Sequence, residues 1–171
     1  MSSFLATTKI VSVREYLSTS YDPDCEYVDG VVVERNIGER DHGKLQRALI
    51  VFFHARRKEW GVHVYPEQRV QVSPTRFRIP DVCVVAGLEP AEQIFTKPPL
   101  ICIEILSSED RLAAVQERVR DFLKLGVRYV WILDPATREA FRCTSDGLQK
   151  VTELRTENPA TVVPIEALFE D

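Results

Sequence analysis

Two acidic residues stand in segments where a charged side chain is out of place. Glu104 interrupts the run 100–106, which is otherwise apolar and predicts a central strand covered on both faces. Asp81 follows Pro80 and opens a second apolar run, 82–85. An ionised carboxylate in a buried strand is costly unless a cation compensates its charge. Asp81 and Glu104 are therefore the first candidates for chemistry.

Asp81 and Glu104 converge if their strands are neighbours in one sheet. Two adjacent carboxylates would raise the pKa of one of them, because like charges disfavour each other. Mg²⁺ suits such a pair, since it binds through one or two carboxylates and keeps several waters. The residues alone leave two interpretations open: a site for Mg²⁺, with Mn²⁺ as a substitute, or a purely structural ion pair between Glu104 and an arginine.

Hydrophobic periodicity, caps and turn residues predict the elements that position this pair. The first half should contain a helix at 13–18 with a Ser12–Glu15 capping box, a hairpin over 25–35 turning at Asp29-Gly30, and a helix at 41–59. Strands are expected at 62–66, 68–72, 79–86 and 99–106. The second half should contain a helix at 108–125 capped by Ser107 or Ser108, a strand at 127–133, a final hairpin near Asp146-Gly147 and a short helix at 164–169.

The two long helices each carry an apolar stripe. The stripe of the first comprises Leu45, Leu49, Phe52 and Phe53, and that of the second Leu112, Val115, Val119, Phe122 and Leu123. This order of elements predicts a mixed sheet with helices on both sides. A length of 171 residues suits one domain, 1–171.

Composition narrows the class of protein. The net charge of −4 argues against a strong, non-specific nucleic-acid binder, although two basic clusters occur at 56–58 and 111–124. The four cysteines form no zinc-like spacing. No apolar stretch is long enough for a membrane span, and the N-terminus lacks the apolar run of a signal peptide. We expect a cytoplasmic protein that does not bind membranes.

The chain resembles the Uma-two family of restriction-endonuclease-like proteins, within the PD-(D/E)XK nuclease fold. The resemblance runs from about Cys25 to Phe141 and depends on the order of short motifs. These are Glu26-Tyr27-Val28-Asp29-Gly30, His42 opening a helix, Ile79-Pro80-Asp81-Val82, Ile103-Glu104-Ile105-Leu106-Ser107, Asp110-Arg111-Leu112, Gly126-Val127 and Val130-Trp131-Ile132-Leu133-Asp134-Pro135. It implies an α/β fold with a restriction-endonuclease-like core, in which helices flank a mixed central β-sheet and β-hairpins lie at both ends.

The resemblance also implies a set of site residues. Asp81 and Glu104 match the metal-binding acidic positions, and the backbone carbonyl of Ile105 is a further expected ligand. Glu26 matches a glutamate of the first hairpin that would add a third carboxylate. His42 either contacts the site or is an ordinary capping or packing histidine.

One position departs from the family pattern. Leu106 stands where the simple motif has lysine, and the residue matching the family's helix-borne lysine is Arg118. Helical geometry places Arg118 beside Val115 and Phe122, on the flank of the buried stripe. Arginine can orient a phosphate, but it does not readily give up a proton and so is no general base.

These features favour metal-dependent hydrolysis of phosphodiester bonds, with nucleic acid, DNA in particular, as the partner. The alternative is a weakened or inactive nuclease fold that acts as a nucleic-acid or protein binding module. A homodimer is expected only by analogy, because cleavage of both strands needs two sites and two-fold assemblies are the commonest.

Overall fold

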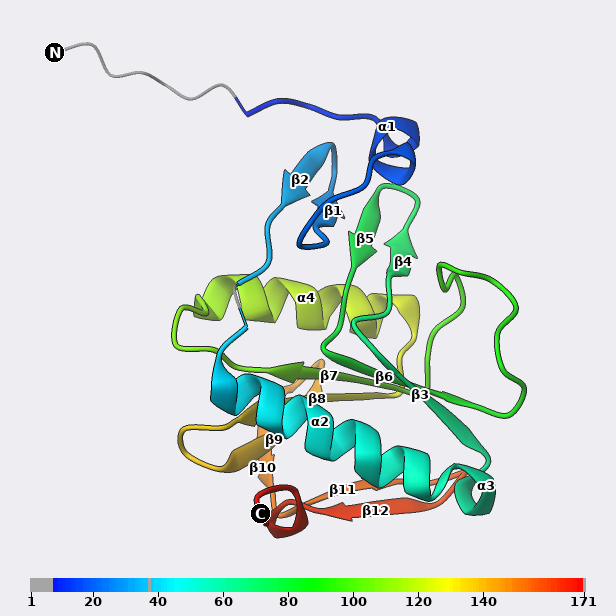
Figure 1. The fold of residues 1–171 in the computed structure, drawn as a ribbon, viewed down its shortest axis with the longest axis vertical. Helices are drawn as coiled ribbons and strands as arrows, with labels where there is room; N and C mark the ends of the chain where they lie inside the picture. Colours follow the sequence, from blue (N-terminus) through cyan, green and yellow to red (C-terminus); the bar gives the residue numbers. More distant parts are fainter. Residues whose placement is uncertain (1–7, 37, 171) are drawn as a thin grey trace, which may run out of the picture.

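A six-stranded mixed sheet forms the centre of the molecule (Figure 1). The computed structural model describes residues 8–36 and 38–170. The strands lie in the order β10-β9-β8-β7-β6-β3, with bounds β3 (Val62–Pro66), β6 (Val82–Ala86), β7 (Ile101–Ile105), β8 (Tyr129–Asp134), β9 (Glu139–Thr144) and β10 (Gly147–Val151). Strands β7 and β8 are parallel, and the other neighbouring pairs are antiparallel. All five residues of β7 are buried, which explains its almost continuous apolar sequence.

Two long helices cover opposite faces of this sheet, as the sequence predicted. Helix α2 (Arg40–Ala55) packs on one face and helix α4 (Leu112–Leu125) on the other (Figure 1). Because side chains alternate along a strand, Ile101 and Ile103 belong to the core cluster of α2, whereas Cys102 belongs to that of α4. The free energy of folding contributed by the core is thus shared between two apolar layers.

A smaller sheet stands above one edge of this centre and follows a short helix, α1 (Val13–Ser18) (Figure 1). Its strand order is β2-β1-β5-β4, with bounds β1 (Glu26–Val28), β2 (Val31–Val33), β4 (Val70–Ser73) and β5 (Arg76–Arg78). The β1–β2 turn contains Asp29 and Gly30, both with positive φ, as its Asp-Gly sequence predicted. Ser12 caps α1 by accepting a hydrogen bond from the Glu15 N–H. Pairing of β1 with β5 places the first hairpin beside the chain that leads into β6.

The C-terminal segment closes the layer of α2. It contains the hairpin β11 (Glu153–Thr156) and β12 (Thr161–Pro164), followed by the 3-10 helix η1 (Glu166–Leu168). Leu154, Val163 and Leu168 are buried in the cluster of α2. No helix in the described ranges is long and apolar enough to span a membrane.

Several boundaries differ from the sequence prediction. The helix expected at 41–59 is two helices, α2 and α3 (Arg57–Trp60), because the backbone leaves helical geometry at Arg56. The helix expected from 108 begins at Leu112, which is 67% exposed and not part of the buried stripe. Neither Ser107 nor Ser108 caps it, because the Ser107 N–H and hydroxyl instead donate to Asp110.

Two strand assignments were also incomplete. The segment expected as one strand over 79–86 begins only at Val82, and the sequence prediction missed β5 just before it. The hairpin at Asp146-Gly147 is present but is not the last, because β11 and β12 follow it. The expected tail helix is reduced to η1.

Candidate active site

Asp81 and Glu104 are brought together by the pairing of β6 with β7. These strands are antiparallel, with Val82 opposite Ile103. Continuing this register by one residue sets Asp81 opposite Glu104, and opposite residues of an antiparallel pair share a face of the sheet. Both are buried, with relative exposures of 6% and 4%. The convergence predicted from the two strands is therefore present.

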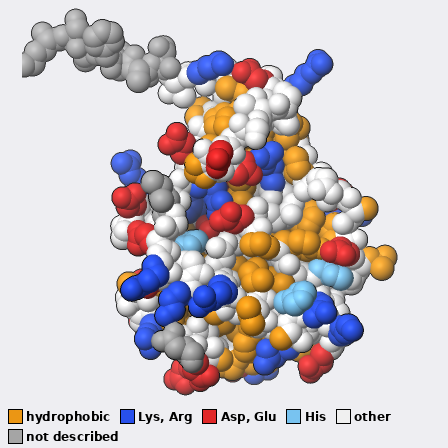
Figure 2. All heavy atoms as spheres, in the orientation of Figure 1, with side chains coloured by type: hydrophobic (Ala, Val, Ile, Leu, Met, Phe, Trp, Pro, Cys, Tyr) orange, Lys and Arg blue, Asp and Glu red, His pale blue; other side chains and the backbone are white. Residues whose placement is uncertain are grey.

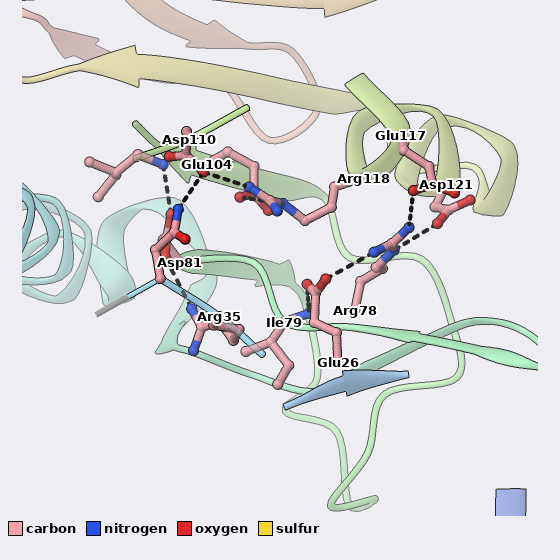
Figure 3. Close-up of polar contacts among 12 residues, drawn as sticks. Glu26, Arg35, Arg78, Ile79, Asp81, Glu104, Asp110, Glu117, Arg118 and Asp121 are labelled. Atoms are coloured by element: carbon pink, nitrogen blue, oxygen red, sulfur yellow. Dashed lines mark hydrogen bonds and ion pairs between the residues drawn. The ribbon is translucent and has the colours of Figure 1, made fainter. Parts of the chain in front are cut away.

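The Asp81 side chain is held by three donors. Its Oδ2 accepts the Ile105 N–H at 2.7 Å, while Oδ1 lies 3.1 Å from Arg35 Nη2 and 3.2 Å from His42 Nε2. Its backbone carbonyl accepts a hydrogen bond from Gln46 Nε2 at 2.9 Å. Asp81 is thus fixed in orientation by a backbone N–H of β7, by His42 of α2 and by Arg35 from the segment before α2; Figure 3 shows Arg35 beside Asp81.

The Glu104 carboxylate is only half satisfied. Its Oε2 accepts a hydrogen bond from Arg118 Nε at 3.1 Å, but its Oε1 is buried and has no hydrogen-bond partner within residues 8–36 and 38–170. The pKa of this carboxyl group is raised to about 8, chiefly by burial; Arg118 opposes the rise and the negative charge of Asp81 adds to it. An unpaired buried carboxylate oxygen is costly, so this position favours a ligand that is positively charged.

Arg118 extends from α4 into the site, on the side that the helical geometry predicted (Figure 3). Besides Glu104, its guanidinium approaches Asp110, with Nη2 lying 3.4 Å from Oδ1. Its side chain retains 19% exposure. Arg118 therefore joins the strand carboxylate to the loop that precedes its own helix.

His42 lies at the N-terminal end of α2 and contacts Asp81 directly. The hydrogen bond with Asp81 raises the pKa of the imidazole, and this effect exceeds the opposing effect of burial. Of the two interpretations open for His42, the structure favours contact with the site.

Glu26 lies at the edge of the site, but both its oxygens are engaged elsewhere. Oε2 lies 2.9 Å from Arg78 Nη1, and Oε1 accepts the Ile79 N–H at 2.9 Å (Figure 3). Arg78 is also bonded to Asp121 of α4, with Nε 2.7 Å from Oδ2. Within 8–36 and 38–170, no group of three or more His, Cys, Asp or Glu side chains is arranged as a metal site. Glu26 thus holds the chain just before Asp81.

A cavity of about 610 Å³ opens over these residues. Glu26, Arg35, His42, Asp81, Glu104 and Arg118 all contribute to its lining. Ser107 and Asp110 form part of its wall and bond to Asn36 of the segment between β2 and α2. The cavity can admit a ligand the size of a phosphate group, and it sets the guanidinium groups of Arg35 and Arg118 among carboxylates.

Sequence reasoning gave no site role to Arg35, Gln46, Arg78 or Asp121, and it placed Asp110 only in a family motif near the start of the second long helix. Arg78 and Asp121 carried a usable signal, because each places a charge next to a buried apolar position, Phe77 or Phe122. Arg35 and Gln46 carried none, since both occur where exposed polar residues are ordinary. Their contacts with Asp81 depend on how α2 approaches the sheet.

The raised pKa of Glu104 predicts a specific pH dependence of stability. A carboxyl group with a raised folded-state pKa stabilises the fold fully below its ordinary value of 4.5 and loses this contribution as pH rises toward about 8. Glutamine does not titrate, so Glu104→Gln should not show this loss. The free energy of unfolding of the variant should therefore rise relative to that of wild type between pH 4.5 and about 8. Urea unfolding across the range measures it; a constant difference would contradict a raised pKa.

The fold and the site define a restriction-endonuclease-like protein. A crystal structure described as a "putative nuclease belonging to DUF820" from Anabaena variabilis superposes with a TM-score of 0.78. It is 20% identical in sequence, and the match covers 93% of this chain and 97% of the other. No curated protein matches the chain. The model of the Uma2 family, described as "Putative restriction endonuclease", matches residues 13–171, and the chain belongs to this family.

Proposed function

We propose that the protein is a metal-dependent nuclease that hydrolyses phosphodiester bonds of DNA. The observation that carries the proposal is the buried pair of Asp81 and Glu104, in which one Glu104 oxygen has no hydrogen-bond partner in the part of the chain that the structure describes. Membership in a family described as restriction endonucleases supports the reaction class. The cavity over the pair supports access by a phosphate group.

The residues present fit a hard divalent cation. Asp81, Glu104 and the backbone carbonyl of Ile105 would hold Mg²⁺, with Mn²⁺ as a substitute, and oxygen is the ligand that both ions accept. When bound, such an ion lowers the pKa of a coordinated water and offsets negative charge on the phosphate. Glu26 is not assigned as a ligand, because Arg78 and the Ile79 N–H already occupy its oxygens.

The chain's own side chains supply orientation and positive charge. Arg118 and Arg35 reach the cavity from opposite sides, and guanidinium groups bind phosphate oxygens with two parallel hydrogen bonds. His42 Nε2 and the Ile105 N–H fix the Asp81 carboxylate. Arg118 stabilises charge but removes no proton from water, because its pKa is raised further by Glu104.

A binding module is the second candidate, and one observation favours it. Arg118 already donates its Nε–H to Glu104 and an Nη2–H to Asp110, so these two carboxylates compete with a phosphate for its charge and hold its guanidinium in place. A protein that keeps this pairing would bind nucleic acid in the cavity without cleaving it. Arg118→Lys would restore the amine that the family pattern has at this position.

The experiment that tests the proposal is cleavage of supercoiled plasmid by the purified protein in Mg²⁺ or Mn²⁺, with EDTA as the metal-free control. We expect nicked or linear product only when metal is present. Arg118→Lys is assayed beside wild type. Cleavage confined to Arg118→Lys would mean that arginine silences a correctly built site, and binding without cleavage by either protein would favour the module.

A further inference from the structure

Helix α2 separates the candidate active site from a second cavity. His42, Gly43 and Gln46 line the first cavity, whereas Arg40, Lys44 and Arg47 line the second, which has a volume of about 570 Å³. The spacing of Arg40, Lys44 and Arg47 places them on one side of the helix, because residues four and seven apart share a face. One helix therefore presents an acidic site on one side and a row of cations on the other.

Arg138 completes the basic lining from the turn between β8 and β9. Its guanidinium lies 5.4 Å from the centre of the Phe169 ring, a position that favours a cation–aromatic contact and restricts the side chain. Arg138 has a positive φ of 58° and is the last residue of the turn before β9. The cation is thus placed before any ligand binds.

The charge of this cavity is opposite to that of the whole chain. Among residues 8–36 and 38–170, four cationic side chains line it, against two carboxylates, Glu170 and Asp41, the latter paired with Arg40; the chain as a whole carries a net charge of −4. Arg47 and Arg138 are exposed, and neither makes an ion pair within the described ranges. Figure 2 shows Lys and Arg side chains gathered over the N-terminal half of α2. Concentrated positive charge on an acidic protein attracts polyanions locally.

We infer that this basic groove, defined by Arg40, Lys44, Arg47 and Arg138, holds the backbone of duplex DNA beside the cleavage site. The inference rests on the proposed nuclease function. An α-helix is about 10–12 Å across, so the groove meets phosphates about three nucleotides from the one that is cleaved. Contacts of this kind position the duplex without reading its sequence.

A second basic cluster provides a matched control. Arg120 and Lys124 are exposed on α4, which covers the opposite face of the sheet, and neither lines either cavity. Removing two charges there changes the net charge by the same amount as removing two from the basic groove. The two variants therefore have the same net charge, and a difference between them reflects where the removed charges lie.

The test is fluorescence anisotropy of a labelled DNA duplex, in EDTA to prevent cleavage, over a series of salt concentrations. Arg47→Gln/Arg138→Gln is compared with Arg120→Gln/Lys124→Gln and with wild type. Each lost phosphate contact lowers the slope of log affinity against log salt by about 0.9, so the groove variant should lose about 1.8 from its slope. The α4 variant should keep the wild-type slope.

The outcomes separate this inference from the proposed function. If wild type binds and cleaves DNA but Arg47→Gln/Arg138→Gln keeps the wild-type slope, the inference about the basic groove is wrong and the proposed function stands. Failure of wild type both to bind the duplex and to cleave plasmid in Mg²⁺ or Mn²⁺ would overturn both. An equal loss of slope in the two variants would show that net charge, not the groove, governs binding, and would also overturn it. Unchanged thermal unfolding of each variant excludes misfolding as the cause.

Discussion

Asp81→Ala is expected to reduce plasmid cleavage by more than about 100-fold, because even the outer partners of a metal site contribute 10–100-fold. The substitution removes one of the two carboxylates proposed to hold the cation. It also leaves Arg35 and His42 without their shared acceptor and frees the Ile105 N–H. The loss should be measured as initial rates of nicking in Mg²⁺ and in Mn²⁺.

The matched control for this loss is Asp146→Ala. Asp146 is an exposed aspartate in the β9–β10 hairpin, and it lines neither cavity. Its removal should leave the nicking rate unchanged. Cleavage by Asp81→Ala at the wild-type rate, by a protein that unfolds at the wild-type temperature, would exclude Asp81 from the site.

Arg78→Met is expected to lower the free energy of unfolding by about 3–5 kcal/mol, because it breaks a buried ionic network by removing one partner. Arg78 is 3% exposed and joins Glu26 of β1 to Asp121 of α4. Methionine keeps much of the volume but leaves two buried carboxylates with one fewer cation. Urea unfolding of the variant measures the change.

Lys150→Met is the control for removal of a paired cation. Lys150 pairs with Glu139 on the surface, with a side chain that is 62% exposed, so solvent screens the interaction. Its unfolding midpoint should stay close to that of wild type. If Arg78→Met lowered the free energy of unfolding as little as Lys150→Met, the ion pairs between the small sheet and α4 would not be what holds the Ile79–Asp81 segment in place.

Most of the main sheet and both covering helices follow from the sequence, because each has a strong local pattern. The apolar run of β7 predicted a buried central strand, and the stripe through Val115 and Phe122 predicted the buried face of α4. The sequence did not predict the break at Arg56 in the first long helix or the late start of α4 at Leu112. The turn made by Ser107 and Asp110 replaced a first helical turn, since a side-chain carboxylate met the backbone donor locally.

The candidate site could be predicted only in part. Asp81 and Glu104 were visible because charge inside an apolar strand conflicts with its surroundings. Arg118 was identified by its match to the family's helix-borne lysine, and its helical position supported that match. The engagement of Glu26 by Arg78 could not be seen, because it depends on β1 pairing with β5, a strand that local patterns did not reveal. The contact of Arg35 with Asp81 depends likewise on tertiary packing.

The most direct test of the account is thermal unfolding of wild type and Asp81→Ala as Mg²⁺ or Mn²⁺ is added. A ligand that binds only the native state stabilises it by about 2.7 kcal/mol at 100 times its dissociation constant. We predict a rise in the unfolding temperature of wild type that saturates with metal and is lost in Asp81→Ala. An unfolding temperature that neither metal changes would contradict a cation site at Asp81 and Glu104, and would leave Glu104 and Arg118 as a structural ion pair.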